Sequence, residues 1–355
     1  MRNDREWQMV TIIGGGIAGS ALAGALARQG KSVRLYEERS AGSGGGAFLF
    51  IDDRGHRALA SLGVDAAAVD AGSYPVTGGI TSANNLGRRG AANGRGHRFW
   101  MRRNLMAILE DFVATSGAEV NYGKPVTDIV FTPGRYTLVQ GDSRTAADDL
   151  IVGADGTDSV VRAAFEPDRH PEYARDVVVY GMTSEPVTLP TDPSTLHFYA
   201  EIAADGSPFS TFGHIWRPGD SAAVWFVRIA RAPLTSGDDI GMRPIADWAD
   251  AIRDATPSNK VLIDVFLATT EGVHVSNARN VPLATASAPS ERALLVGDAD
   301  HAITPAAGVG ARDALEDVRA VYDAVVAGTS PAVAMAERRR RIIADRELVR
   351  RRSAR

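Results

Sequence analysis

The fold is decided by the stretch VTIIGGGIAGSALAGALARQG, residues 10–30. An apolar, β-branched run at residues 9–13 predicts a buried parallel strand. Small and apolar residues then recur with helical spacing, which predicts a helix. Between the two, Gly14, Gly16 and Gly19 stand in the spacing G-x-G-x-x-G. This order predicts the first strand, turn and helix of a Rossmann-like α/β domain.

Each glycine has a physical role in such a turn. Gly14 permits the tight turn, Gly16 lets a pyrophosphate approach the backbone, and Gly19 lets the helix pack closely on the strand. A second predicted strand, SVRLYEE, carries Glu37 near its end, where a carboxylate can accept hydrogen bonds from ribose hydroxyls. The pattern predicts a dinucleotide site, but by itself it does not separate FAD from NAD.

Composition excludes several classes of protein. The chain has 355 residues, a formal net charge of −4 and no cysteine. Disulfides, a cysteine nucleophile, cysteine–metal sites and a thioether-linked cofactor are therefore excluded. There is no apolar run of transmembrane length and no signal-peptide core. We expect a soluble, cytoplasmic protein without a bound metal and without a nucleic-acid or membrane partner.

Two further strand ends carry polar motifs. An apolar strand pattern runs into GADGTDSVVR, and another, ALLV, runs into GDADHAITPAAGVG before a helical pattern. Polar groups at the carboxyl ends of neighbouring parallel strands meet at one edge of a sheet, where ligands bind. The candidate residues in these two stretches are Asp155, Asp298, Pro305, Gly308 and Gly310.

In this order, the motifs resemble those of the group A flavoprotein monooxygenases, which have the para-hydroxybenzoate hydroxylase fold. The fingerprint with Glu37, the D-G motif and the G-D motif all match, and RRNL, from Arg102 to Leu105, fits the family's R-x-x-L. The matching motifs span residues 10–317. The resemblance implies that both glycine turns hold one noncovalent FAD, with Arg102 and Val126 among its contacts.

The resemblance also assigns roles in the G-D motif. Asp298 is expected at the ribityl chain, and the helix after Gly310 is expected to direct its N-terminus at the flavin. His301 has a structural role there. The chain departs from the family at Asp300, where an apolar residue is usual, and at Arg312, where asparagine is common.

The implied activity is that of an FAD-dependent monooxygenase. In the family, NADH or NADPH reduces the flavin, and O2 forms a C4a-hydroperoxide that hydroxylates or epoxidises an aromatic or polycyclic small molecule. The sequence leaves open the substrate, the choice between NADH and NADPH, Baeyer–Villiger insertion, and whether the protein is a monomer or a homodimer.

Three other functions share this fold. A redox-neutral biosynthetic cyclase would keep FAD as a structural element, and a non-enzymatic flavin-binding protein would lack a pocket over the flavin. A flavin halogenase needs a catalytic lysine in the first third of the chain and a W-x-W-x-I-P motif. No lysine lies between Lys31 and Lys124, and that motif is absent.

The domain organisation is expected to be discontinuous. Residues 1–80, 98–175 and 281–355 would form the FAD-binding domain, and residues 81–97 and 176–280 an inserted, antiparallel-sheet substrate domain. The strand patterns STLHFYAEIA, FSTFGHIW and AAVWFVRIA and the short helix PIADWADAIRDATP support this insertion.

Two segments have more than one interpretation. Residues 84–97, NNLGRRGAANGRGH, lack periodicity and predict a mobile surface loop. The C-terminal AERRRRIIADRELVRRRSAR carries nine arginines, which are typical of an anion-binding surface or of a solvated helix. Because Glu337, Asp345 and Glu347 interleave with the arginines, we favour the solvated helix.

The substrate site is predicted from the hairpin around Pro218-Gly219-Asp220. This turn pairs His214 with Trp225 and Phe212 with Val227. Alternation then puts Phe212, His214 and Trp225 on one face. Together with Tyr199, which resembles a substrate-binding tyrosine of the family, and with Pro305, these side chains are expected to line the cavity over the flavin. A neutral His214 would favour a neutral or phenolic substrate.

Overall fold

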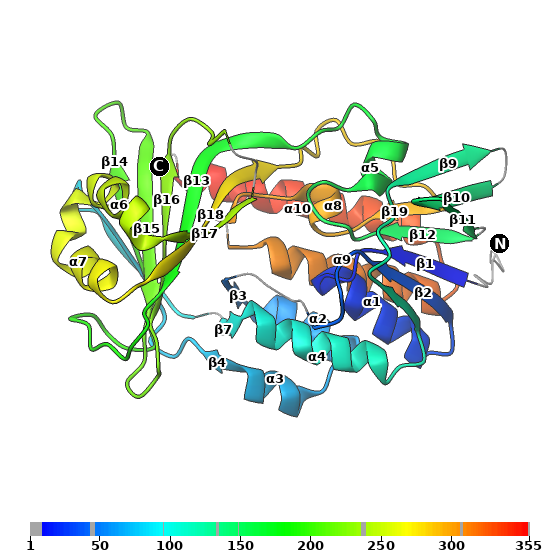
Figure 1. Cartoon of the computed structure of the whole chain (residues 1–355), viewed down its shortest axis with the longest axis horizontal. Helices are drawn as coiled ribbons and strands as arrows, with labels where there is room; N and C mark the ends of the chain where they lie inside the picture. The colour runs from blue at the N-terminus through cyan, green and yellow to red at the C-terminus, as the bar shows by residue number, and fades with distance from the viewer. Residues whose placement is uncertain are drawn as a thin grey trace.

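The computed structural model describes residues 9–42, 47–94, 96–132, 135–147, 149–235, 239–305 and 308–353. Figure 1 shows two parts side by side: a parallel sheet flanked by helices, and a large sheet with two short helices on its outer side. No helix among the described residues is both long enough and apolar enough to cross a lipid bilayer.

The first part is built on a five-stranded parallel sheet with the order β19-β12-β1-β2-β8. Its strands are β1 (Met9–Ile13), β2 (Ser32–Glu37), β8 (Glu119–Tyr122), β12 (Leu150–Gly153) and β19 (Ala293–Leu295). The predicted strands at residues 9–13 and 32–38 are thereby confirmed. Apolar residues dominate these strands because both faces of the sheet are covered.

Helices cover one face of this sheet, and a second sheet covers the other. The helices of the first face are α1 (Ile17–Arg28), α4 (Arg102–Ala114) and α9 (Gly310–Val326). Their apolar stripes and the sheet share one core, which includes Ile12, Leu22, Leu105 and Leu315. A small antiparallel sheet, β11-β10-β9, packs on the opposite face. Its strands are β9 (Asp128–Thr132), β10 (Arg135–Gln140) and β11 (Ser143–Ala147).

The second part is an eight-stranded sheet with the order β17-β18-β13-β16-β15-β14-β5-β6. Its strands are β5 (Ile80–Asn84), β6 (Arg89–Ala92), β13 (Glu172–Met182), β14 (Leu196–Ile202), β15 (Pro208–Ile215), β16 (Val224–Ala230), β17 (Asp239–Pro244) and β18 (Gly272–Asn280). The sheet is antiparallel except for the parallel pair β14–β5. The exact domain boundaries given above stay a prediction.

Two helices close the outer face of the large sheet. They are α6 (Ala249–Ala255) and α7 (Lys260–Ala268), each preceded by a short 3₁₀ turn, Ile245–Asp247 and Pro257–Asn259. The sequence pattern predicted α6 but not α7. Phe266 of α7 lies among aromatic residues of β15 and β16.

The remaining elements include helices whose apolar residues pack in the cores of the first part. They are the sheet β3-β7-β4, made of β3 (Phe48–Ile51), β4 (Ser73–Pro75) and β7 (Arg98–Met101), and the helices α2 (Asp53–Ser61), α3 (Ala66–Gly72), α5 (Val160–Phe165), α8 (Asp298–His301) and α10 (Pro331–Ser353).

The prediction that residues 84–97 form a loop is wrong at β6, whereas their mobility stays a prediction. Much of this stretch belongs to a hairpin in which β6 pairs with β5 at the edge of the large sheet. The side chains of β6 are exposed, so the strand has no apolar alternation. Backbone hydrogen bonds, which leave no mark on hydrophobic periodicity, hold it in the sheet. Arg95 lies outside the described residues.

Candidate cofactor and substrate site

A cavity of about 580 Å³ opens at the carboxyl ends of β1, β2 and β12. Six of the predicted cofactor-binding positions line this cavity: Gly14, Gly16, Glu37, Arg102, Val126 and Asp155. Gly19 does not line it, and neither do Asp298, Pro305, Gly308 and Gly310. The structure therefore brings the glycine turn predicted for the adenosine and pyrophosphate end of FAD together with three further predicted contacts, Arg102, Val126 and Asp155.

The glycine-rich turn has the geometry its spacing predicts. Gly14 has a φ of +98°, and a Cβ there would collide with the backbone of Ala154. At Gly19 an added Cβ would collide with the carbonyl oxygen of Gly14. At Gly16, by contrast, nothing lies within 4 Å of such a Cβ. The backbone of Gly16 therefore faces open space in which a pyrophosphate fits.

The carboxylate of Glu37 closes the end of β2 over this turn. The Gly15 N–H donates to Glu37 Oε2 at 2.6 Å, and the Arg39 N–H donates to Oε1 at 2.8 Å. Arg102, at the first position of α4, is half-buried in the same cavity. Burial lowers the pKa of Arg102, and Asp298 and Glu37 oppose this shift. Arg102 is thus electrostatically coupled to both ends of the predicted site.

Asp155 shows that the cavity suits a polar ligand. Its Oδ2 accepts hydrogen bonds from the N–H groups of Val160 and Val161, at 2.8 and 3.2 Å. Its Oδ1 is buried and has no hydrogen-bond partner among the described residues. Burial raises the pKa of this carboxyl. A ligand carrying hydroxyl groups, as FAD does, would satisfy the orphaned oxygen.

The G-D motif forms a second polar edge. Gly297 has a φ of +60°, which turns the chain from β19 into α8 and leaves the side chain of Asp298 exposed. Asp298 Oδ1 lies near Gly310, at the start of α9. That helix begins without a side-chain cap, so its first N–H groups are available to an anionic or polar ligand. Gly308 has a φ of +63°, and Pro305 is exposed.

The two departures from the family pattern are explained by ion pairs. Asp300 is fully buried and accepts from Arg169 and Arg339. Arg312 pairs with Asp313 at 2.8 Å and with Asp52 at 3.4 Å.

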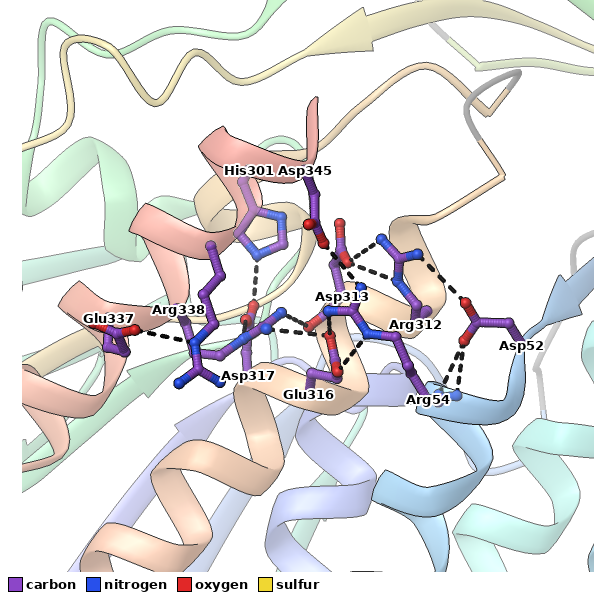
Figure 2. Close-up of polar contacts among 12 residues, drawn as sticks. Asp52, Arg54, His301, Arg312, Asp313, Glu316, Asp317, Glu337, Arg338 and Asp345 are labelled. Atoms are coloured by element: carbon purple, nitrogen blue, oxygen red, sulfur yellow. Dashed lines mark hydrogen bonds and ion pairs between the residues drawn. The ribbon is translucent and has the colours of Figure 1, made fainter. Parts of the chain in front are cut away.

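His301 is buried and hydrogen-bonds to Asp317, which agrees with a structural role (Figure 2). Although burial by itself lowers the pKa of His301, the charge of Asp317 outweighs it and raises that pKa to about 9.

The predicted hairpin register is confirmed, but the predicted face is wrong. His214 pairs with Trp225 and Phe212 with Val227, as the turn at Gly219 requires. However, the rings of Phe212, His214 and Trp225 pack against Phe266 of α7. They lie in a core on the outer side of the sheet, away from the cofactor-binding part.

Tyr199 belongs to this same outer layer. Its ring stacks with Phe212 and His214. Thr191 hydrogen-bonds to His214 Nε2 at 3.0 Å, and burial lowers the pKa of His214 to about 3. None of these side chains contacts the cofactor cavity. The inference about substrate that rested on a flavin-facing His214 is therefore withdrawn.

The opposite face of the sheet carries a different set of side chains. Along one cross-strand row stand Phe198, Gly213, Phe226, Tyr180 and His274. We call this set the aromatic row. Apart from Gly213 its members are aromatic, with Phe226 at 8% exposure and the others half-buried.

Phe48 of β3 meets the aromatic row edge-on. The ring centroids of Phe48 and Tyr180 are 5.7 Å apart, and the two rings are nearly perpendicular. Because Leu49 and Ile51 of β3 pack in the core of the cofactor-binding part, the aromatic row that Phe48 contacts faces that part. Sequence reasoning missed these residues, because alternation alone does not tell which face a helix covers.

Comparison with known proteins places these features in a family. A model of the FAD-binding domain matches residues 8–331. The kynurenine 3-monooxygenase of Salinispora arenicola is 27% identical over 94% of this chain and 76% of its own. The 6-hydroxynicotinate 3-monooxygenase of Pseudomonas fluorescens is 26% identical over 87% and 80%.

Solved structures share the fold at lower identity. A salicylate hydroxylase in a substrate complex superposes with a TM-score of 0.77 at 20% identity, covering 99% of this chain and 89% of that chain. CtdE in complex with FAD gives 0.75 at 18% identity, covering 97% and 93%. The chain belongs to the FAD-binding domain family and is a group A, FAD-dependent monooxygenase with the para-hydroxybenzoate hydroxylase fold.

Proposed function

We propose that this protein uses NAD(P)H and O2 to hydroxylate a small aromatic molecule that stacks on the aromatic row. The observation that carries the proposal is the row itself, with Phe226, Tyr180 and Phe198 on the sheet face that looks toward the cofactor-binding part. Relatives named for hydroxylation of aromatic rings support it. When bound, FAD supplies the redox chemistry.

The protein's own residues bind the cofactor and the ring. Asp155, Glu37 and Asp298 are proposed to accept hydrogen bonds from FAD, and Arg102 and the N–H groups of the glycine turn are proposed to hold its pyrophosphate. The aromatic row is proposed to orient the substrate by offset stacking and to exclude water from the reacting atoms.

Tyr180 is proposed to supply the polar contact in this row. Burial raises the pKa of its hydroxyl, which therefore stays protonated and can donate to a substrate oxygen or nitrogen. Arg228, further along β16 on the same face, is already paired with Asp176 at 2.8 Å. A neutral or phenolic ring therefore fits this surface better than an aryl carboxylate, which needs an uncommitted cation.

The test is a screen of neutral and carboxylated aromatic compounds against the purified, FAD-loaded protein. We expect a neutral or phenolic compound to stimulate NAD(P)H oxidation and to gain one oxygen atom from ¹⁸O-labelled O2. Comparing NADH with NADPH in the same assay identifies the reductant. A product isomeric with its substrate and formed without NAD(P)H would instead identify a redox-neutral enzyme.

A further inference from the structure

The arginine-rich C-terminal helix presents two different faces. In α10 the exposed arginines Arg340 and Arg341 pair with Glu337 of the same helix. Arg338 and Arg339 are buried, at 5% and 8% exposure, beside the apolar residues of the same stripe, Met335 and Ile342. The predicted solvated helix is therefore correct for one face only, because the acidic partners of the other face lie on distant segments.

Arg338 binds the buried carboxylate of Asp317 on α9. Its Nε donates to Asp317 Oδ1 at 2.9 Å (Figure 2). The other oxygen, Oδ2, accepts from His301 Nε2 and from the backbone N–H of Gly297 at 3.1 Å. Asp317 thus links Arg338 of α10 to the two ends of the G-D turn. These ends are Gly297, its first residue, and His301, the last residue of α8.

Arg339 binds a second buried carboxylate, that of Asp300. Its Nε donates to Asp300 Oδ2 at 2.8 Å, and its Nη2 donates to Oδ1 at 2.6 Å. Arg346, two turns further along α10, donates from Nη2 to the carbonyl oxygen of His301 at 2.7 Å. Three arginines of one helix thereby hold both ends of α8.

Such support is needed because α8 is only four residues long. It has no side-chain cap and too few internal hydrogen bonds to fix its own orientation. The neighbouring side chains of this short helix point in two directions. Asp300 and His301 are buried toward α10, whereas the side chain of Asp298 is exposed and interacts electrostatically with Arg102 of the cofactor cavity. The direction of Asp298 is therefore set by contacts made on the opposite side of α8.

We infer that Arg338 and Arg339 are positioning residues for FAD: by holding Asp317 and Asp300 they fix the G-D turn that presents Asp298. Neither arginine lines the cofactor cavity. The inference rests on FAD binding and not on the hydroxylation proposed above. A failure to find a substrate would therefore leave its test unaffected.

The experiment measures FAD affinity of the apoprotein by fluorescence quenching, together with its thermal midpoint. Arg339→Gln removes the bidentate contact to Asp300, and Arg340→Gln, on the exposed face of the same helix, is the matched control. We expect the Kd for FAD to rise about tenfold in Arg339→Gln, because the buried carboxylate of Asp300 loses its bidentate partner and keeps the pair with Arg169. Arg340→Gln should leave the Kd unchanged.

The two readouts separate positioning from a general loss of stability. If Arg339→Gln lowers the thermal midpoint of the apoprotein while the Kd for FAD stays at the parental value, the inference is wrong. If this variant does not fold, Arg339→Lys is measured instead. Lysine keeps the positive charge but cannot form the bidentate pair of hydrogen bonds with the two carboxylate oxygens of Asp300. We expect an intermediate Kd, and a parental Kd in this variant would equally overturn the inference.

Discussion

The burial of His214 makes the stability of the protein depend on pH. In the folded protein the pKa of His214 is about 3, whereas the unfolded chain titrates near 6.5. Between pH 6.5 and pH 3 the side chain of His214 is therefore protonated in the unfolded state but stays neutral in the native state. Because folding lowers the pKa of His214, the neutral side chain contributes fully to the free energy of unfolding above about pH 6.5. This contribution is lost as the pH falls toward 3.

We predict that His214→Phe makes the protein less sensitive to acid. Phenylalanine suits the stack with Phe212 and Phe266 but cannot be protonated. Between about pH 7.5 and pH 5, the free energy of unfolding should fall by about 2 kcal/mol less in the variant than in the parent. Urea titrations at the two pH values measure this difference. His170→Asn, at an exposed position, should retain the parental pH dependence.

Asp298 is the residue that most directly tests the cofactor site. A charge-assisted hydrogen bond contributes roughly 1.5–3 kcal/mol, so Asp298→Asn should raise the Kd for FAD about ten- to a hundredfold. Because the side chain of Asp298 is accessible and its desolvated surroundings raise the pKa of the carboxyl, removal of the charge should not lower the thermal midpoint of the apoprotein. Asp254→Asn, at an exposed position on α6, is the control, and equal Kd values in the two variants would argue against the predicted register of the G-D motif.

At the scale of elements, the hairpin β15–β16 separates the proposed substrate-binding face from the face that packs in the core. Phe226 lies in the aromatic row on one face, and Phe212 lies beneath α7 on the other. We predict that Phe226→Ala raises the KM of a stimulating substrate while FAD content stays normal. Phe212→Ala should instead lower the free energy of unfolding by about 3–5 kcal/mol, because it leaves a cavity in a closed core.

Steady-state kinetics and urea titration of both variants check this assignment. The opposite pattern, with substrate kinetics changed in Phe212→Ala alone, would return the site to the outer face. Gly213 offers a second probe, since a Cβ there would collide with the ring of Phe226. Gly213→Ala should therefore resemble Phe226→Ala.

The same hairpin shows how far the sequence leads. The turn at Gly219 and strict alternation were sufficient for the register, because both are local. They did not determine the face, because Phe212 and Trp225 on one side are as apolar as Ile215 and Phe226 on the other. The decisive signal is the stretch KVLIDVFLA, residues 260–268, which forms a helix that must cover one face of a sheet.

The conformation of the first glycine turn, by contrast, was fully predictable from the sequence. At Gly14 and Gly19 the backbone itself limits what the position accepts, so identity and spacing carry the structure. For α10 the pattern of Arg340, Arg341 and Glu337 was local and led to a solvated helix. The buried contacts of Arg339 reach back 39 residues to Asp300, and such pairing leaves no periodic trace in the sequence.

At the scale of the whole molecule, the two parts meet in the cofactor cavity through one side chain. Arg279 of β18 is the single contribution of the large sheet to the cavity lining, within the residues that the structure describes. Its guanidinium makes a two-pronged ion pair with Asp158 of the D-G loop, with both distances at 2.7 Å. The side chain of Arg279 is 17% exposed and that of Asp158 is 71% exposed, and a two-pronged geometry is the case in which a partly exposed pair does add to stability.

Because Arg279 lines the cavity in addition to pairing with Asp158, we expect it to act on ligand binding as well as on folding. We expect this guanidinium, which the large sheet carries to the cavity, to help hold FAD and so to couple cofactor binding to the placement of that sheet. Arg279→Gln should therefore raise the Kd for FAD and reduce the stabilisation that a fixed FAD concentration gives, which follows RT ln(1 + [L]/Kd). Thermal midpoints with and without FAD measure this. The control is Arg253→Gln, which breaks an exposed pair with Asp264 outside the cavity. If FAD raises the thermal midpoint equally in the two variants, the large sheet has no part in holding the cofactor.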